Sequence, residues 1–486
     1  MDRQVPTRLR LAYGVGSVAD GVKNVTFNAF LVLYYTTVLG LPGTLSGLAI
    51  FIALCVDAIS DPLVGSLSDN FHSRFGRRHP FMFFAALPMG LCMLGLFAPP
   101  PGLSQAGLFG WLLSFSIGVR LFLTFYMVPS GAMAPDMTTH YDERTTLNSF
   151  RWLLGWIGAL VMASTGWFVF LADRGDEIGE GRLLAANYPI LGAFAGVMVF
   201  VAILASSLGT RSLIPRLRQG TRPGPLFSLS RFGGELRTAL DSHSMRVLLG
   251  SALFFAAALG VGEVLGTYMS TWFWEFRSEQ LGMLSLFQVV PLLLGVAMVR
   301  PFSEAMDKRS AVLRLALFAI LWGPLPVILR LLELAPENGS PWLLVMIMGH
   351  GALLVAALIQ IGILNGAMVM DAIDENEYLT GRRHEGVFVS ALSFTGKAVS
   401  GFGNLLGGVI LDLIRFPTGD AAAVGSVPQD AIVRLGLIAG PGLTILYLCA
   451  LGFLSRLRLT RARYAEVNAA LQARAEERVG RGRPRT

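Results

Sequence analysis

Charge is scarce in this sequence. Of its 486 residues, 15% are charged and 53% are hydrophobic, whereas a soluble domain carries about 25% charged residues. A chain of this length cannot cover a water-facing surface with so few charges. The composition therefore excludes an ordinary soluble protein and predicts a chain that lies mostly in lipid, where its 55 glycines and 32 phenylalanines fit closely packed helices.

Cysteine and the motifs of metal and nucleotide chemistry are also scarce. The three cysteines lie in apolar runs without metal-ligand spacing or a disulfide pattern. No HExxH, GxSxG or GxxxxGK[ST] motif occurs, and the GVG at 14–16 follows no strand. A membrane transferase that holds Mg2+ needs a longer, regularly spaced aspartate array than Asp57, Asp61 and Asp69 provide. We therefore expect neither an enzyme nor a cofactor.

Long apolar runs, in contrast, dominate the chain. A membrane-spanning helix needs about 20 mostly apolar residues. The first apolar run contains Asp20 and Lys23 and lacks a small-residue cleavage site, so we interpret it as a span and not as a signal peptide. The twelve predicted spans are 11–40, 45–68, 80–99, 107–134, 146–172, 188–208, 245–275, 280–302, 311–333, 341–371, 386–413 and 432–456.

The arginines predict the orientation of these spans. They gather after the second, sixth, eighth and tenth spans and in the C-terminal tail. The loop after the first span has none, and the loop after the fifth is net acidic. The positive-inside rule then places both termini in the cytoplasm of a cell (inner) membrane.

The long central loop divides the spans into two groups of six. A weak internal similarity supports a repeat. Proline and an acid precede a basic turn both after the second span, in DPLVGSLSDNFHSRFGRRHPF, and after the eighth, in VRPFSEAMDKRSAVLR. The tail is predicted to be an amphipathic helix that contacts anionic lipid and not nucleic acid. The predicted domains are an N-terminal six-helix bundle (1–208), a cytoplasmic loop (209–244), a C-terminal six-helix bundle (245–456) and a basic cytoplasmic tail (457–486).

Charges inside the second span are the first candidate functional residues. A charge at mid-membrane costs roughly 2.5–3.5 kcal/mol on insertion scales. Asp57 and Asp61 are four residues apart and share a helix face with Ser60. A bound Na+ or a proton would relieve the repulsion between the two carboxylates, and carboxylate and hydroxyl oxygens are ligands that a hard cation prefers. The pattern indicates a cation site; the alternative is a structural ion pair with a basic residue.

Two of the three lysines also lie inside spans. Lys23 shares a face with Asp20, either as a local ion pair or beside a carboxylate that accepts hydrogen bonds from substrate hydroxyls. Lys397 lies among small residues that permit close helix approach, and the aspartates of the second span are its natural partners. Weaker candidates are Thr124, Tyr126 and Arg151, of which Arg151 is either a ligand or a side chain that extends to the inner membrane surface. Arg120, Glu263 and His350 also lie within spans, each either a structural hydrogen-bond partner or a ligand.

Five motifs follow one another along nearly the whole chain: YGVGSVAD (13–20), DAISDP (57–62), DERTTLNSFR (142–151), DENEYLTGRRHEGVF (374–388) and the lysine at 397. In this order they resemble the glycoside–pentoside–hexuronide:cation symporter family, whose members are melibiose permease-like and belong to the major facilitator superfamily. The resemblance implies a transporter that takes up a sugar together with a cation.

The resemblance also implies roles for individual residues. The implied cation ligands are Asp57, Ser60, Asp61 and Thr124, with Asp57 and Asp61 as the metal ligands if the ion is Na+. The implied substrate residues are Asp20 and Arg151, and we expect Lys23, Tyr126 and Met127 to belong to the same substrate site. Lys397 falls on a lysine of the family and is the expected coupling residue. Met127 stands where the family has a sugar-binding aspartate and Gly131 where it has a tryptophan, which argues against a galactoside.

We therefore expect an all-α polytopic membrane protein of the major facilitator fold, with twelve transmembrane helices in two six-helix bundles. The expected function is symport of a sugar or glycoside with Na+ or H+ by alternating access, carried out by a monomer whose partners are its substrate and membrane lipids. The alternative substrate is an amphiphile such as a lysophospholipid. The residues expected to pair across the bundles as a cytoplasmic gate are Asp69, Arg77, Arg78, Arg144, Arg382 and Arg383.

Overall fold

The computed structural model describes residues 5–71, 73–138, 140–175, 180–214, 234, 237, 240, 242–380, 385–418 and 422–481. Over these ranges the regular structure is helical, with no strand. Ten helices are long and apolar enough to cross a membrane, and they coincide with the predicted spans two to ten and twelve. The remaining two spans are a broken first helix and an eleventh whose apolar part is Val399–Leu413. The prediction of an all-α polytopic fold is confirmed.

The spans of the N-terminal half begin and end close to the predicted limits. The first consists of α1 (Thr7–Val15), α2 (Val18–Val25) and the π-helical η1 (Thr26–Leu31) and η2 (Leu33–Val38). The next five are α3 (Gly43–Asn70), α4 (His79–Leu96), α5 (Gln105–Gly131), α7 (Tyr141–Thr165) extended by η3 (Gly166–Phe170), and α9 (Tyr188–Gly209). Short connections are α6 (Ala134–Met137), α8 (Glu180–Leu183), η4 (Ala185–Asn187) and η5 (Arg211–Leu213).

The spans of the C-terminal half follow the same pattern. They are α12 (His243–Tyr268) with η6 (Met269–Phe273), α13 (Ser278–Phe287) with α14 (Val289–Ala305), α15 (Lys308–Trp322) with α16 (Leu325–Leu331), α17 (Pro341–Thr380), α18 (Glu385–Leu413), and α19 (Gln429–Leu437) with η8 (Ile438–Gly442) and α20 (Leu443–Leu454). The tail forms α21 (Arg461–Arg481), so its predicted helix is present.

Packing divides the chain into two compact units. Unit 1 comprises Met1–Phe227, Gly260–Leu286 and Ser400–Gly436. Unit 2 comprises Ser228–Leu259, Phe287–Val399 and Leu437–Thr486. Unit 1 thus contains the N-terminal half together with parts of the seventh, eighth, eleventh and twelfth spans. The division into two six-helix bundles stays a prediction.

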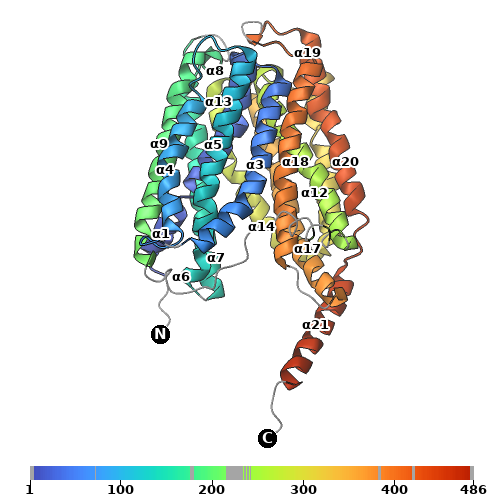
Figure 1. Cartoon of the computed structure of the whole chain (residues 1–486). Helices are drawn as coiled ribbons and strands as arrows, with labels where there is room; N and C mark the ends of the chain where they lie inside the picture. The colour runs from blue at the N-terminus through green and yellow to red at the C-terminus, as the bar shows by residue number, and fades with distance from the viewer. Residues whose placement is uncertain are drawn as a thin grey trace. The chain divides into compact units, whose positions relative to one another are not determined.

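Helices of the N-terminal half touch backbone to backbone. In unit 1, α4 and α9 run alongside each other (Figure 1). A Cβ added at Gly90 would lie 2.9 Å from the carbonyl oxygen of Gly196, and one added at Gly196 would lie 2.5 Å from that of Gly90. Between α2 and α7, a Cβ at Gly21 would lie 1.9 Å from the carbonyl oxygen of Gly155. Only glycine permits such close contact of two helices in lipid.

The first span is interrupted where a side chain from α5 reaches it. A Cβ at Gly16 would lie 1.6 Å from the hydroxyl oxygen of Tyr126. The helix breaks between α1 and α2 at this point, and Ser17 follows. After the break, Asp20 lies in the first turn and Lys23 in the last turn of a second helical segment, α2, beside α5 and α7.

Within unit 1, a segment of α18 packs on the start of α3. The carboxylate of Asp412 accepts hydrogen bonds from the backbone N–H groups of Gly43 and Thr44, at 2.9 and 2.7 Å. A Cβ at Gly408 would lie 2.0 Å from the carbonyl oxygen of Gly43. Asp412 therefore satisfies two of the N–H groups that the N-terminus of α3 leaves without an intrahelical partner.

Candidate functional site

Three oxygens from two helices converge in the middle of unit 1. The Thr124 hydroxyl on α5 lies 2.9 Å from Asp57 Oδ1 and 3.0 Å from Asp61 Oδ1, both on α3. Asp57 is 9% exposed and Thr124 is 3% exposed. Helix α3 continues through Pro62, so the two aspartates keep the four-residue spacing that turns them to the same side. The hydroxyl has one proton and can donate it to one carboxylate at a time.

A guanidinium stands at the same place. Arg120 Nη1 lies 3.8 Å from Asp57 Oδ2, and its guanidinium lies 5.0 Å from the ring centre of Phe27. Arg120 is 7% exposed. The sequence left it equally a structural partner or a ligand, although its position four residues before Thr124 puts both on one face of α5. That spacing is the signal that could have placed it beside the aspartates.

The chemistry of this cluster suits a hard monovalent cation or a proton. Ser60 is buried nearby on α3, where its hydroxyl donates to the carbonyl of Asp57 at 3.1 Å. No group of three or more His, Cys, Asp or Glu side chains that could hold a metal ion occurs among the described residues. Two carboxylate oxygens each lie within 3.0 Å of the Thr124 hydroxyl oxygen. This donor set suits an alkali cation better than a transition metal.

A second polar group lies on α2. Lys23 Nζ lies 3.3 Å from Asp20 Oδ1 and donates to Asn24 Oδ1 at 2.5 Å, while Asn24 donates to Asp20 Oδ2 at 3.2 Å. The local ion pair considered for Asp20 and Lys23 is therefore present. The Asp20 side chain remains 38% exposed, so its carboxylate can still accept hydrogen bonds from a ligand. Glu263 on α12 is exposed and lies within electrostatic range of Lys23.

Arg151 is held between α1 and α5. Its Nη1 donates to the hydroxyl of Tyr13 at 3.1 Å, its Nε to Ser17 Oγ at 3.3 Å, and its Nη2 lies 3.7 Å from the sulfur of Met127. A Cβ at Gly131 would lie 3.0 Å from the same Nη1. The guanidinium thus occupies the space next to Gly131, where the family resemblance implies a tryptophan, and it contacts the residue that replaces the family's aspartate.

Three further candidate residues lie elsewhere. Tyr126 is fully buried, and its hydroxyl donates to Ser206 Oγ at 2.8 Å, so it offers no surface to a ligand and joins α5 to α9. Lys397 is half-buried on α18 and belongs to unit 2, so its pairing with the aspartates of unit 1 stays a prediction. His350 lies in unit 2, where its Nε2 is 2.8 Å from the carbonyl oxygen of Trp322 and its ring stacks on that indole. These contacts favour a structural role.

The residues predicted to form a gate make contacts inside unit 1. Arg78 pairs with Asp136 and, at 3.4 Å, with Asp69, and Arg77 pairs with Asp136 at 3.2 Å. Burial lowers the pKa of the Arg78 guanidinium, and Asp136 acts in the opposite direction. Arg144 donates to the carbonyl of Thr138 at 3.1 Å. Arg382 and Arg383 lie outside the described residues, so pairing across the bundles stays a prediction.

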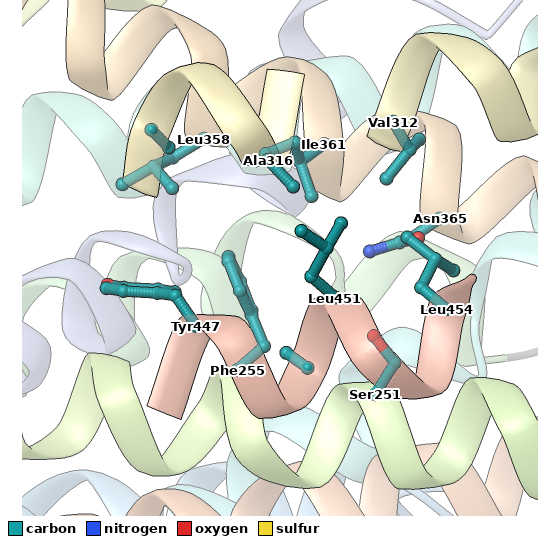
Figure 2. A pocket seen from close by; sticks show the side chains of 12 residues that line it. Ser251, Phe255, Val312, Ala316, Leu358, Ile361, Asn365, Tyr447, Leu451 and Leu454 are labelled. Atoms are coloured by element: carbon teal, nitrogen blue, oxygen red, sulfur yellow. The ribbon is translucent and has the colours of Figure 1, made fainter. Parts of the chain in front are cut away.

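Unit 2 contains a cavity of a different character. It is lined by side chains from α12, α15, α17 and α20 that are almost all apolar, and Figure 2 shows Asn365 among Val312, Leu451 and Leu454. Asn365 Oδ1 is buried and accepts no hydrogen bond from the residues that the structure describes. Ser251 and Tyr447 contribute the other polar groups. The cavity carries no charge and does not resemble the cluster in unit 1.

Comparison with known proteins agrees with these features. Residues 12–461 match the family described as MFS/sugar transport protein. The chain is 25% identical to the uncharacterized symporter YnaJ of Bacillus subtilis, over 86% of this chain and 85% of that protein. It is 22% identical to the isoprimeverose transporter of Lactiplantibacillus pentosus (84% and 80%) and 23% identical to the glucuronide carrier protein homolog of Escherichia coli (85% and 85%).

Solved structures are similar in fold. A partially occluded inward-open conformation of the xylose transporter XylE from E. coli aligns with a TM-score of 0.56 at 14% identity, covering 94% of this chain and 98% of that one. A D-xylose–proton symporter aligns with a TM-score of 0.58 at 14% identity, covering 90% and 97%. These likenesses confirm the major facilitator fold. Because the family match covers nearly the whole chain and the relatives include named symporters, the chain belongs to the MFS/sugar transport family, of the glycoside–pentoside–hexuronide:cation symporter type.

Proposed function

We propose that this protein is a secondary active transporter that carries a sugar or glycoside across a cell (inner) membrane together with Na+ or H+. The observation that carries the proposal is the convergence of Asp57, Asp61 and Thr124 in the middle of two membrane spans. Charged groups at this depth are costly and mark ion pathways. Relatives named as symporters and as carriers of isoprimeverose support sugar as the substrate.

The cation binds first in this mechanism. One positive charge lowers the repulsion between the two carboxylates and allows the site to order. Entry of one charge down 100 mV contributes about 2.3 kcal/mol. At about 1.4 kcal/mol per tenfold, this drives roughly 50-fold accumulation of a neutral solute. Alternating access then exposes the occupied site to the other side of the membrane.

The substrate binds beside Asp20 and Arg151. The exposed carboxylate of Asp20 accepts hydrogen bonds from hydroxyl groups, and Arg151 donates to a ring or carboxylate oxygen. Lys23 orients Asp20, and Met127 gives the site an apolar wall next to Arg151. Tyr126 is left out of the proposed site because it is fully buried. The relatives do not favour the alternative substrate, an amphiphile.

The remaining expectations are part of the same proposal. Lys397 couples cation and substrate binding, and the basic residues of the cytoplasmic loops contribute to a gate. Both termini lie in the cytoplasm, and α21 approaches anionic lipid. The protein works as a monomer and catalyses no chemical reaction.

The test is thermal unfolding of the purified protein against glycosides, pentoses and uronic acids, with Na+ or choline and at two pH values. A ligand at about 100 times its dissociation constant adds about 2.7 kcal/mol to the stability of the folded state. We expect one sugar class to raise the unfolding midpoint only when the coupling cation is present. Arg151→Gln should abolish that shift. A panel in which no sugar acts, while a lysolipid does, would overturn the sugar assignment.

A further inference from the structure

Arg120 is a buried guanidinium that is not fixed by hydrogen bonds. It contributes no hydrogen bond to the contacts that the structure describes, and its Nε is buried without an acceptor in the same part of the chain. Its ion pair with Asp57, at 3.8 Å, is longer than a hydrogen bond. The face of Phe27, 5.0 Å away, provides the remaining contact.

A structural arginine in the same unit looks different. Arg78 donates hydrogen bonds to two carboxylates, those of Asp69 and Asp136, and to the carbonyl of Ala132. Its Nε, like that of Arg120, has no acceptor among the described residues, but both of its Nη atoms donate, as in a fixed structural pair. Arg120 has the burial of such a residue without its hydrogen bonds, so it can exchange one carboxylate for another at little cost.

Three carboxylates lie within electrostatic range of Arg120. Besides Asp57, these are Asp20 on α2 and Glu263 on α12. Asp57 belongs to the proposed cation site, and Asp20 belongs to the proposed substrate site. The other positive charge near Glu263 is Lys23, which pairs with Asp20 at 3.3 Å. One guanidinium on α5 is thus shared between the cation and the substrate groups.

We propose that Arg120 is an internal counter-cation that competes with the transported cation for Asp57. In the empty carrier it compensates the charge of Asp57, and when a cation binds it shifts toward Asp20 and Glu263. The shift changes the charge beside the substrate carboxylate and so links the two sites. Arg120 acts here as a positioning residue, and the inference rests on the cation site of the proposed function.

The experiment measures Na+ binding to the purified full-length chain. Sodium chloride replaces choline chloride at constant ionic strength, and tryptophan fluorescence and the unfolding midpoint report occupancy. Arg120→Gln removes the competing charge, so the apparent Kd for Na+ is expected to fall at least about tenfold, equivalent to about 1.4 kcal/mol. Arg120→Lys keeps the charge and should remain within about threefold of the wild type, equivalent to about 0.7 kcal/mol.

A matched control is Arg182→Gln, which removes a fully buried arginine from α8, outside the spans. It should leave the Kd for Na+ unchanged. If Arg120→Gln does not fold, Glu263→Gln tests the same competition from the other side. It removes a carboxylate that attracts Arg120 away from Asp57, so Na+ binding should weaken about threefold.

The direction in which the Na+ affinity changes in Arg120→Gln separates a competing role of Arg120 from a structural one. An arginine that only holds Asp57 in position would weaken Na+ binding when removed, and an unchanged or weaker affinity in Arg120→Gln overturns the proposal. No response to Na+ in either protein overturns it too. If Na+ binds Arg120→Gln but not the wild type, the competition stands, while Na+ coupling in the proposed function fails and the proton remains.

Discussion

The interiors of unit 1 and unit 2 differ in chemistry. In unit 1, helices α3 and α5 bring Asp57, Asp61, Thr124 and Arg120 together in mid-span. In unit 2, helices α15, α17 and α20 enclose an apolar cavity in which Asn365 supplies an amide and no charge (Figure 2). We therefore expect cation binding at the cluster of unit 1 and not at the cavity of unit 2.

The ends of the helices, in contrast, are alike. In unit 1, Arg78 at the start of the third span pairs with Asp136, just after the fourth. In unit 2, Lys308 at the start of the ninth span pairs with Asp371 near the end of the tenth, at 2.7 Å. We expect these ion pairs, which occur in both units, to hold helices together, and the carboxylate cluster of unit 1 to bind the cation.

The largest effect is expected from Asp61→Asn. The substitution removes one of the two carboxylates and leaves an amide that cannot compensate a cation. Cation-dependent uptake into vesicles should fall about 1000-fold, equivalent to about 4.1 kcal/mol. Asp371→Asn, which alters a carboxylate of the other half, should keep the cation dependence. Equal loss in both variants would contradict the assignment of ion chemistry to the first half.

Loss of the ion pairs at the helix ends should lower the free energy of unfolding. Arg78→Gln removes a buried guanidinium that donates to Asp136, Asp69 and the carbonyl of Ala132, and the free energy of unfolding should fall by about 2 kcal/mol. Lys308→Gln should cost about 1 kcal/mol, because the Lys308 side chain is 37% exposed. Chemical denaturation in detergent measures both. Arg434→Gln, from the exposed pair with Asp430, serves as the control with a change below about 0.5 kcal/mol.

A smaller effect is expected from Asp412→Ala. The variant loses two hydrogen bonds to the N-terminus of α3 and the favourable charge at that helix end. The stability should fall by about 1 kcal/mol, as for the loss of a helix cap. The unfolding midpoint without ligand measures this. Asp430→Ala is a carboxylate control from the start of α19, and an equal loss there would show that the contact with α3 is not the cause.

The smallest effect is expected from Asn365→Leu. The amide oxygen has no hydrogen-bond partner among the residues that the structure describes, so an apolar side chain in its place should raise the stability by about 0.5 kcal/mol or leave it unchanged. Cation-dependent uptake should stay at the wild-type level. A loss of uptake with unchanged stability would mean that the cavity of unit 2 takes part in transport.

The sequence predicted what lies along one helix better than what lies between helices. The spans and the shared face of Asp57 and Asp61 follow from periodicity and hydropathy, and the structure confirms their place on α3. The family resemblance brought Thr124 into the predicted site, and it lies within hydrogen-bonding distance of both carboxylates. Neither route placed Arg120 beside Asp57.

Contacts between helices were harder to predict because they depend on rotation and local breaks. Tyr126 was expected to bind substrate, but its side chain is fully buried and its hydroxyl occupies the space that a Cβ at Gly16 would need. The ion pair of Arg78 with Asp136 also needed the structure, because 58 residues separate the partners. The sequence identified Arg78 as a basic loop residue, and not which acid it would face.

The glycine contacts between α4 and α9 also constrain how such a chain can change. A Cβ at Gly90 or Gly196 has no space, since the obstacle is the backbone of the neighbouring helix and no side chain can move aside. A chain that adapts to a new solute must therefore keep glycine at both positions. Met127, beside Arg151, is free of such a constraint, and it is at positions of this kind that one scaffold can acquire many cargoes.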